Sequence, residues 1–361
     1  MKVEKSDRVM LLSALKKSGD NSKELVKFLK EVDGRLFDQA LFLIDNMPDR
    51  DLKSISAKLL LATVKWADLA RQTLPWDKVP DSIFLNDVLP YAVVNERRDL
   101  WREDFYHRFF KLVKGCSSAS EAAVLLNKKV WKLVGVKYST KRPKLDQSAY
   151  ESIDAKMASC TGLSILLIDA CRAVGIPARL IGVPSWVDKS GNHSWVEIWD
   201  NGWHFLGAYD GQELDKGWFT SKASKANDSS WMYKVYATSF KKETMYFPCV
   251  WDYRVKYIPT VLRTKFYNGF AKKELPLTRL LVKVYDRKTG DRLVAEVKVM
   301  LANELVGSGQ TSSEVRDNND ILEFNLTPQK KYQLIVNYHG EIIREMVTIT
   351  KSKNQLIKLY F

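Results

Sequence analysis

The sequence predicts an α+β protein in three parts: a helical N-terminal region over residues 1–120, a mixed core over 121–265 and a C-terminal antiparallel β-sandwich over 270–361. Three observations support this division. Apolar residues recur at helical spacing up to about residue 114, alternate with a period of two from about residue 280, and show both patterns in between. The length of 361 residues also suits two or three domains of ordinary size.

Proline residues divide the N-terminal region into several short helices. Proline ends or redirects a helix, so we expect breaks at Met47-Pro48, Leu74-Pro75 and Val79-Pro80. Residues 114–118 are rich in Ser and contain Gly, which is typical of a loop. Another helix is predicted directly after this loop, at residues 119–134.

The C-terminal segment has the pattern of short strands separated by turns. The predicted strands cover residues 280–285, 293–297, 332–338, 342–349 and 355–360. Their close spacing favours a small antiparallel sandwich, of an immunoglobulin-like or regulatory type. The segment Asp-Asn-Asn-Asp at 317–320 resembles part of a calcium loop, but the remaining ligands are absent, so we expect a surface turn there.

The net charge is +14, and most of the excess lies in the middle of the chain. Residues 126–275 contain 23 basic and 14 acidic residues. Such a segment could favour an anionic partner, such as nucleic acid, an acidic polymer or a membrane surface. No nucleic-acid-binding module accompanies the charge, so a solvated lysine-rich face is the favoured interpretation. Apolar runs such as residues 59–62 and 165–168 are far shorter than the about 20 residues of a membrane-spanning helix.

The cysteines and the first residues bear on metal binding and compartment. No Cys-x-x-Cys pair is present, so we expect free thiols and no structural zinc site. The start of the chain is charged, and the apolar stretch at residues 9–12 is too short for the core of a signal peptide. This pattern fits a cytoplasmic protein, or an exported protein whose signal has been removed. The four cysteines are Cys116, Cys160, Cys171 and Cys249.

Cys160 lies at the predicted start of a helix that Gly175 and Pro177 end. The unpaired N–H groups and the dipole at a helix N-terminus favour an anion. We therefore expect a lowered pKa for the Cys160 thiol and a thiolate nucleophile. The alternative is a buried and unreactive cysteine, which is the commoner environment for a lone cysteine.

A β-hairpin is predicted downstream, with strands at 193–199 and 203–210. A two-residue Asn201-Gly202 turn would place Asp200 opposite Trp203 and, seven residues further along both strands, His193 opposite Asp210. A slip of one residue would destroy this pairing. The expected chemistry is a Cys160 thiolate, general acid and base catalysis by His193, and a carboxylate that orients the imidazole.

Four separated sequence blocks resemble the core of the transglutaminase-like superfamily. They are Ser-Cys-Thr-Gly-Leu at 159–163, Ala-Val-Gly-Ile-Pro-Ala-Arg at 173–179, His-Ser-Trp-Val-Glu at 193–197 and Asn-Gly-Trp at 201–203. In that family a Cys opens a helix, and a His and then an Asp lie on following strands in a papain-like arrangement. The resemblance covers about residues 125–245. It implies a papain-like core, and it favours the nucleophile over the unreactive cysteine.

The sequence departs from the family pattern at the acid. The family places its Asp four residues after the Trp of the Asn-Gly-Trp block, and Gly207 occupies that position in this chain. Asp210 is the nearest replacement and is also the residue that the hairpin register selects, with Asp215 as a weaker candidate. If neither Asp reaches His193, a Cys/His dyad or a catalytically inactive binding protein is the alternative.

Other residues have supporting or structural roles in this interpretation. The N–H of Cys160 suits an oxyanion site, and Gln147 resembles the upstream polar donor of papain-like enzymes, with a solvated loop Gln as the alternative. Trp195 either walls the cleft beside His193, as a substrate-binding residue, or packs in the sheet. His107, His204 and Cys171 are interpreted as structural residues, with Cys171 in the core.

The resemblance and the residues together predict acyl transfer at an amide bond through a thioester on Cys160, most simply hydrolysis by a peptidase or amidase. Transglutaminase crosslinking is an alternative, as is an inactive protein-binding or glycan-binding protein. The expected partner is a protein or peptide substrate, with a cell-wall peptide as one possibility. No metal or organic cofactor, nucleic-acid module or membrane span is expected.

Overall fold

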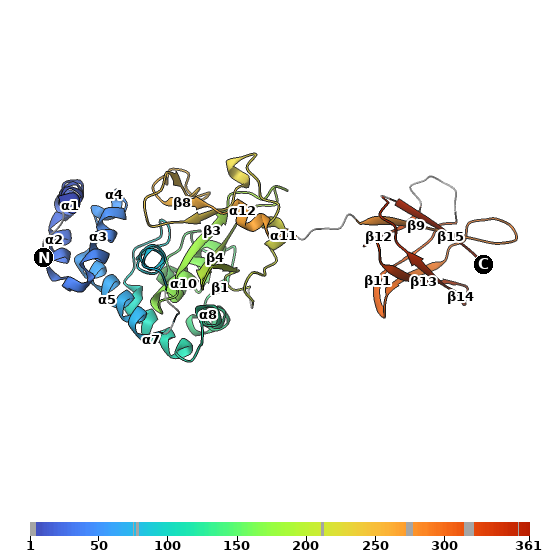
Figure 1. Ribbon diagram of the computed structural model, residues 1–361, viewed down its shortest axis with the longest axis horizontal. Helices are drawn as coiled ribbons and strands as arrows, with labels where there is room; N and C mark the ends of the chain where they lie inside the picture. Colours follow the sequence, from blue (N-terminus) through green and yellow to red (C-terminus); the bar gives the residue numbers. More distant parts are fainter. Residues whose placement is uncertain are drawn as a thin grey trace. The chain divides into compact units, whose positions relative to one another are not determined.

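The computed structural model describes residues 5–74, 76, 79–210, 213–271, 277–313, 321–352 and 354–361. The chain forms two compact units, Met1–Ala271 and Lys272–Phe361 (Figure 1). The predicted α+β class is confirmed, because helices fill the first part of the chain, helices and a sheet form the middle, and strands form the last part. No helix among the described residues is long and apolar enough to cross a membrane.

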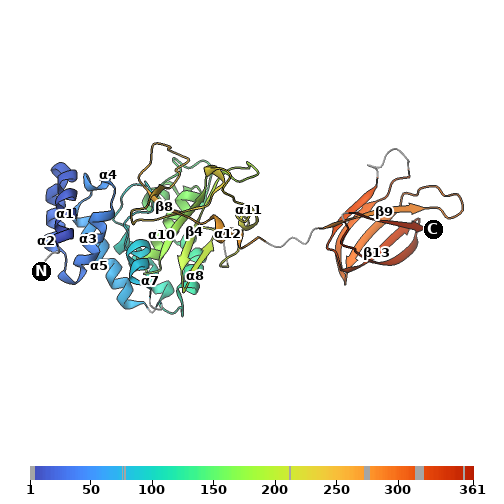
Figure 2. The same cartoon turned by 45° about the horizontal axis from the view of Figure 1, so that its top comes forward.

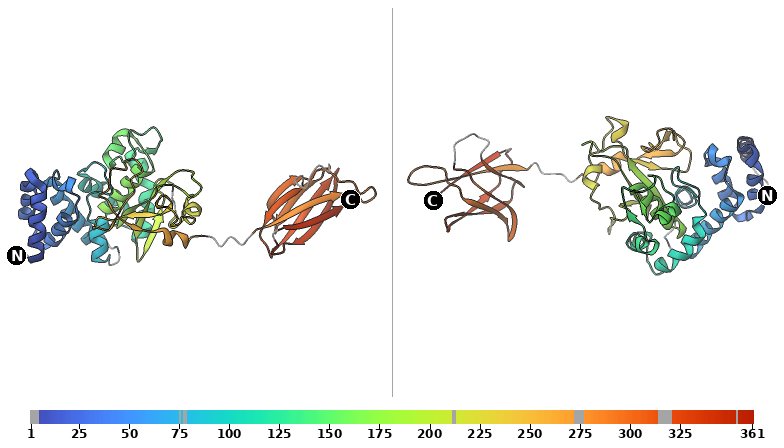
Figure 3. Two further views of the ribbon diagram at one scale, coloured as in Figure 1. Left: turned by 90° about the horizontal axis from the view of Figure 1, so that it is seen from above. Right: turned by 180° about the vertical axis from the view of Figure 1, so that it is seen from behind.

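The N-terminal helices end where the prolines predict. Helix α3 ends at Asn46, before Met47-Pro48, and α5 ends at Thr73. Their buried faces form one core that includes Leu25, Phe28 and Leu43, and the helices lie beside one another in blue in Figure 3. The helices are α1 (Lys5–Ser18), α2 (Ser22–Glu31), α3 (Phe37–Asn46), α4 (Asp49–Leu52), α5 (Ala57–Thr73), α6 (Asp81–Ile83) and α7 (Trp101–Val113).

The expected boundary near residue 120 falls inside the first unit. Phe105 and Phe109 of α7 are fully buried in the same core as Leu126 of α8 (Ala119–Val134) and Leu166 of α10. Helix α8 covers the predicted residues because Ser118 caps its start and Gly135, at φ 72°, ends it. Helices on both sides of the expected boundary therefore pack around α10. The remaining helices are α9 (Ala149–Ala155), α10 (Cys160–Ala173), α11 (Thr220–Ala223) and α12 (Thr264–Asn268).

An antiparallel sheet with the strand order β5-β4-β3-β6-β8-β7 lies beside α10 (Figure 2). Alternation divides its side chains between two cores. Leu180 and Val196 join the core with α10, whereas Ile181 and Trp195 face a second, aromatic core. The strands are β3 (Ala178–Val183), β4 (His193–Trp199), β5 (Trp203–Leu206), β6 (Tyr236–Thr238), β7 (Met245–Tyr246) and β8 (Pro259–Leu262). A separate parallel pair joins β1 (Lys137–Tyr138) to β2 (Met157–Ala158).

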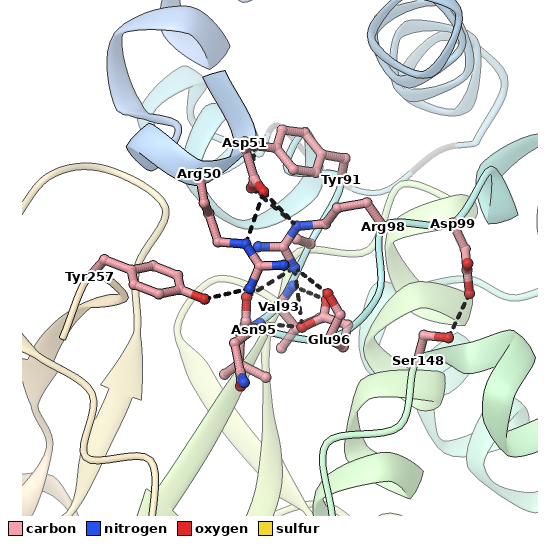
Figure 4. Close-up of polar contacts among 12 residues, drawn as sticks. Arg50, Asp51, Tyr91, Val93, Asn95, Glu96, Arg98, Asp99, Ser148 and Tyr257 are labelled. Carbon is pink, nitrogen blue, oxygen red and sulfur yellow. Dashed lines mark hydrogen bonds and ion pairs between the residues drawn. The ribbon is translucent and has the colours of Figure 1, made fainter. Parts of the chain in front are cut away.

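A buried polar cluster joins the N-terminal helices to the rest of the first unit (Figure 4). The Arg98 Nε lies 3.0 Å from a carboxylate oxygen of Asp51, which also accepts a hydrogen bond from the Tyr91 hydroxyl at 2.9 Å. Arg50 donates to the Tyr257 hydroxyl at 2.7 Å. Removing one member of a buried ion pair typically costs about 3–5 kcal/mol, so this cluster fixes the helices against the sheet region.

The second unit consists of two sheets around one core. One sheet has the order β11-β10-β13-β14 and the other β12-β9-β15. The expectation of a wholly antiparallel unit is wrong, because β15 pairs with β9 in parallel. The strand predicted to begin at residue 293 begins at Glu296. The acidic turn at 317–320 lies outside the described residues. The strands are β9 (Thr278–Tyr285), β10 (Glu296–Leu301), β11 (Glu304–Gln310), β12 (Leu322–Leu326), β13 (Lys331–Tyr338), β14 (Glu341–Thr348) and β15 (Asn354–Tyr360).

Candidate active site

Cys160 is the first residue of α10, as the sequence predicts. The Ser159 side chain caps the helix by accepting a hydrogen bond from the Gly162 N–H at 3.2 Å. The Leu163 N–H donates to the Ser159 carbonyl, so the N–H groups of Cys160 and Thr161 precede the first bond of the helix. Cys160 keeps some solvent exposure, whereas the other three cysteines are buried, and all four are free thiols.

The pKa of the Cys160 thiol is raised and not lowered as the sequence predicts. Burial has the largest effect and raises its pKa. Hydrogen bonds from the Ser194 backbone and from Thr161 lower the pKa, but by less than burial raises it. The expected lowering by the helix N-terminus is therefore wrong for the resting protein, in which the sulfur is a thiol.

The hairpin register differs by one residue from the predicted register. Trp199 lies opposite Trp203 and Val196 opposite Leu206, so the loop has three residues and not two. Asn201 takes the left-handed conformation that this longer loop needs, at φ 55°. Because β5 ends at Leu206, none of its residues faces His193, whose cross-strand neighbour is Val183 of β3. The predicted pairing of His193 with Asp210 across the hairpin is wrong.

His193 lies in an aromatic enclosure at the start of β4. Its ring centroid is 4.8 Å from that of Trp218 and 5.0 Å from that of Phe219, and it stacks on Trp195 at 5.7 Å. The ring is 9% exposed, and its buried Nε2 has no hydrogen-bond partner among the described residues. Burial lowers the pKa of His193 to about 4, so the imidazole is neutral at pH 7.

The two candidate acids bind other groups. Asp210 accepts a hydrogen bond from the Trp218 indole N–H at 3.3 Å, so it contacts a residue that covers His193 and not His193 itself. Asp215 lies 2.7 Å from Nδ1 of His204 and accepts the Phe205 N–H.

The backbone near the family's acid position is held by α8. The side chain of Asn127 donates to the Gly207 carbonyl at 2.9 Å and accepts the Tyr209 N–H at 3.0 Å. The side chain of Asn127 is almost fully buried. These bonds fix the segment after β5 against α8, and no carboxylate forms a hydrogen bond with His193 among the described residues.

The structure also corrects the two remaining site assignments. The Gln147 amide donates to the backbone carbonyls of Glu151 and Met157, so both of its hydrogens are occupied and it offers no oxyanion donor. It supports the turn just before Cys160 instead. Trp195 is fully buried and donates to the Tyr267 hydroxyl at 2.7 Å. It stacks on the His193 ring from the protein interior and cannot touch a substrate.

The sequence predicts structural roles for three further residues, and each of them contacts groups other than Cys160 and His193. Cys171 is fully buried in the core of α10, His107 packs on Trp66 with ring centroids 5.0 Å apart, and His204 pairs with Asp215.

Sequence reasoning missed two contacts of the site. Ser194 presents its backbone to the Cys160 sulfur and its hydroxyl to Thr161, at 3.1 Å, and so joins β4 to the start of α10. Trp218 is 57% exposed and forms the outer wall over His193. An exposed aromatic cannot be told from a core aromatic by residue type alone, because both occur in the same aromatic-rich segment.

Comparisons with known proteins give a family match and a similar solved structure. Residues 108–219 match the family model of the transglutaminase-like superfamily. A crystal structure from Cytophaga hutchinsonii, named as a "putative cysteine protease", is 16% identical, with a TM-score of 0.30 over 53% of this chain and 68% of that chain. A search of the curated proteins gives no match.

Proposed function

We propose that this protein transfers an acyl group from an amide to the thiol of Cys160 and then to water, because residues 108–219 match the family model of the transglutaminase-like superfamily. In this proposal Cys160 is the nucleophile and His193 is the general acid and base. No carboxylate forms a hydrogen bond with His193 in the part of the chain that the structure describes, so the proposed catalytic unit is a dyad.

One observation carries the proposal. Ser194, the residue next to His193 in β4, joins that strand to the start of α10, because its hydroxyl lies 3.1 Å from the Thr161 hydroxyl and its carbonyl accepts a hydrogen bond from Ser164 at 3.4 Å. Cys160 opens α10 and His193 opens β4, although the two residues are 33 apart in the sequence. Nucleophilic catalysis by a cysteine needs a base within reach of the thiol, and we propose that the His193 imidazole is this base.

The proton moves in both directions during the proposed cycle. In the resting state the thiol and the imidazole are both neutral, so His193 accepts the thiol proton as the sulfur attacks the amide carbonyl. The N–H of Cys160 stabilises the oxyanion that forms. The imidazolium then gives its proton to the departing amine, and a thioester remains. A water molecule, deprotonated by His193, attacks the thioester, and the sulfur leaves and recovers the proton.

Water is the proposed acceptor because nothing among the described residues marks a binding site for an acceptor amine. If an amine took the place of water, the same dyad would form a crosslink. The two outcomes differ in the second half of the cycle only.

A labelling experiment tests the proposal. The protein is incubated with a peptide library in water enriched in oxygen-18, with and without a small fluorescent amine. Incorporation of oxygen-18 at new carboxyl groups supports hydrolysis, whereas incorporation of the amine supports crosslinking. A Cys160→Ser variant that gives the same products as the wild-type protein would refute both, and Cys171→Ser serves as the matched control.

An inactive binding protein is the second candidate. It is favoured by the raised pKa of the Cys160 thiol and by the unpartnered Nε2 of His193. Both are features of a site that has lost its acid. Absence of any product that depends on Cys160 in the labelling experiment would favour this candidate.

A further inference from the structure

The two sheets of the second unit have unequal sizes, and a groove lies at the side where they do not match. The groove has a volume of about 570 Å³ and is lined by β14 and β15, the outer strands of the four-stranded and the three-stranded sheet. The smaller sheet therefore has no strand opposite β14. A fourth strand beside β15 would fill this position.

The opposite side of the unit is closed. There Gly309 and Gly307 of β11 leave room for the side chains of Leu322 and Phe324 of β12. A Cβ at Gly309 would lie 2.5 Å from a methyl carbon of Leu322, and one at Gly307 would lie 3.0 Å from the ring of Phe324. The two sheets thus touch along one side and separate along the other, so the groove is a local property of β14 and β15.

Strand β15 has a free edge along this groove. It pairs with β9 over all seven residues of Asn354–Tyr360 and with no other strand among the described residues. A strand at the edge of a sheet presents unpaired N–H and C=O groups, which an extended peptide can satisfy. Apolar side chains line the groove at Ile343 of β14 and at Ile357 and Leu359 of β15. Charged side chains also line it, at Glu341 and Glu345 of β14, at Lys358 of β15 and at Arg287.

The outer face of β15 carries an unbalanced positive charge. Lys358 lies directly beside Lys283 of β9, on the same face of the sheet. Neither lysine forms an ion pair with a carboxylate among the described residues, and like charges at directly opposed positions repel each other. A carboxylate on a strand added next to β15 would face Lys358 and relieve this repulsion.

We propose that this groove binds an extended segment of a partner protein as an added strand on β15. Its inward side chains are apolar and cover Ile357 and Leu359 beneath β14. Its outward side chain opposite Lys358 is acidic. This interaction is independent of the reaction proposed for Cys160.

A second copy of this chain fits the groove less well. Pairing of two β15 edges brings no carboxylate to Lys358, because residues 354–360 contain no Asp or Glu. Such a pairing would bury the lysines without a counter-charge.

Peptide binding to the full chain tests the proposal. The probe is a fluorescein-labelled nonapeptide of alternating valine and threonine, with one central threonine replaced by glutamate or, in a second peptide, by lysine. Fluorescence anisotropy should show saturable binding, about three- to fivefold tighter for the glutamate peptide. The Lys358→Glu variant should reverse this preference. Lys298→Glu is the matched control, because this exposed lysine lies on β10, which has a paired strand on both sides, and it should leave the preference unchanged.

Three results would overturn the proposal: no saturable binding of either peptide, an unchanged preference in Lys358→Glu, or a loss of preference in Lys298→Glu. Hydrogen exchange locates the bound peptide, since the proposal requires slower exchange of the β15 amides and fails if only other strands slow. Sedimentation analysis addresses the second copy. A dimer that Lys358→Glu abolishes and that the peptides do not displace would assign the groove to self-association and refute the proposed partner.

Discussion

Strands β4 and β5 each carry a histidine, and the two histidines have opposite surroundings. His193 on β4 is buried among aromatic rings, beside the residue that contacts Cys160, and has no carboxylate partner among the described residues. His204 on β5 is about one third exposed, and its Nδ1 lies 2.7 Å from Asp215. Asp215, the weaker of the two acids predicted for His193, thus lies beside His204, and Asp210, the preferred one, binds Trp218.

The difference shows that position near a nucleophile and support by a carboxylate are separate properties. A carboxylate would stabilise an imidazolium, whereas the aromatic enclosure favours the neutral ring of His193. The neutral ring is a competent base toward a thiol, but it gives no stable ion pair in the resting state. The proposed reaction therefore relies on proton transfer as the sulfur attacks and not on a thiolate formed beforehand.

The largest effect on catalysis should come from substituting each of the two histidines in turn. We expect His193→Gln to lower kcat/KM for the substrate found with oxygen-18 labelling by about 10²–10⁴-fold, because it removes the general acid and base. His204→Gln, the matched control, should change kcat/KM by less than about twofold. An equal loss in both variants would show that the contrast between the two histidines has no catalytic meaning.

The second test asks whether the Cys160 sulfur is a thiol or a thiolate in the resting protein. Since burial raises the pKa of the Cys160 thiol, alkylation by iodoacetamide should be slow at neutral pH. Its rate should rise about tenfold per pH unit from pH 6 to pH 9, with the labelled residue identified by mass spectrometry. Amide cleavage should stay nearly constant over the same range, because the neutral pair is the active form. Fast alkylation of Cys160 at pH 6 would instead demonstrate a preformed thiolate.

Much of the fold could be predicted from local signals in the sequence. Helix α8 covers the predicted residues, because a capping serine and a left-handed glycine mark its ends. The start of α10 at Cys160 was predicted for the same reason.

The lack of a carboxylate opposite His193 on β5 could not be predicted, because the pairing depends on one extra residue in the loop of the hairpin. Asn201 serves a three-residue loop and a two-residue turn equally well by composition, yet the choice moves every opposed residue by one. The contact of Asn127 with Gly207 joins residues 80 apart in the sequence, and no local pattern reveals it. The pKa of Cys160 likewise depends on how deeply tertiary packing buries the thiol.

The contrast between partnered and unpartnered groups extends to the buried carboxylates. Oδ1 of Asp87 is buried without a partner among the described residues, and burial raises the pKa of Asp87 to about 6. The unfolded chain releases this proton near pH 3.8, so the folded state loses stability as the pH rises from about 4 to 6. The Asp87→Asn variant should be more stable than the wild type by up to about 3 kcal/mol at pH 8 and nearly equal at pH 4.

His193 contributes to the pH dependence of stability with the opposite sign to Asp87. Its pKa is about 4 in the folded protein and 6.5 in the reference state, so the folded state loses stability as the pH falls from about 6.5 to 4. Urea unfolding of Asp87→Asn and of His193→Gln at several pH values separates the two contributions. Asp51→Asn is the control for Asp87, because Asp51 is buried but paired with Arg98, and its loss should destabilise at pH 8. A stabilised Asp51→Asn would remove the distinction.

The smallest effect on stability should come from breaking the pair of His204 and Asp215. Asp215→Asn weakens the bond to His204, and it keeps a side-chain oxygen that can still accept the Phe205 N–H. Both partners are about one third exposed, so solvent screens their charges. We expect a loss of about 1 kcal/mol or less in the free energy of unfolding, measured in urea at pH 7. Cleavage by the Cys160 dyad should not change, since the pair does not contact His193. If Asp215→Asn impaired cleavage as strongly as His193→Gln, then Asp215 would serve the catalytic histidine after all, in a conformation other than this one.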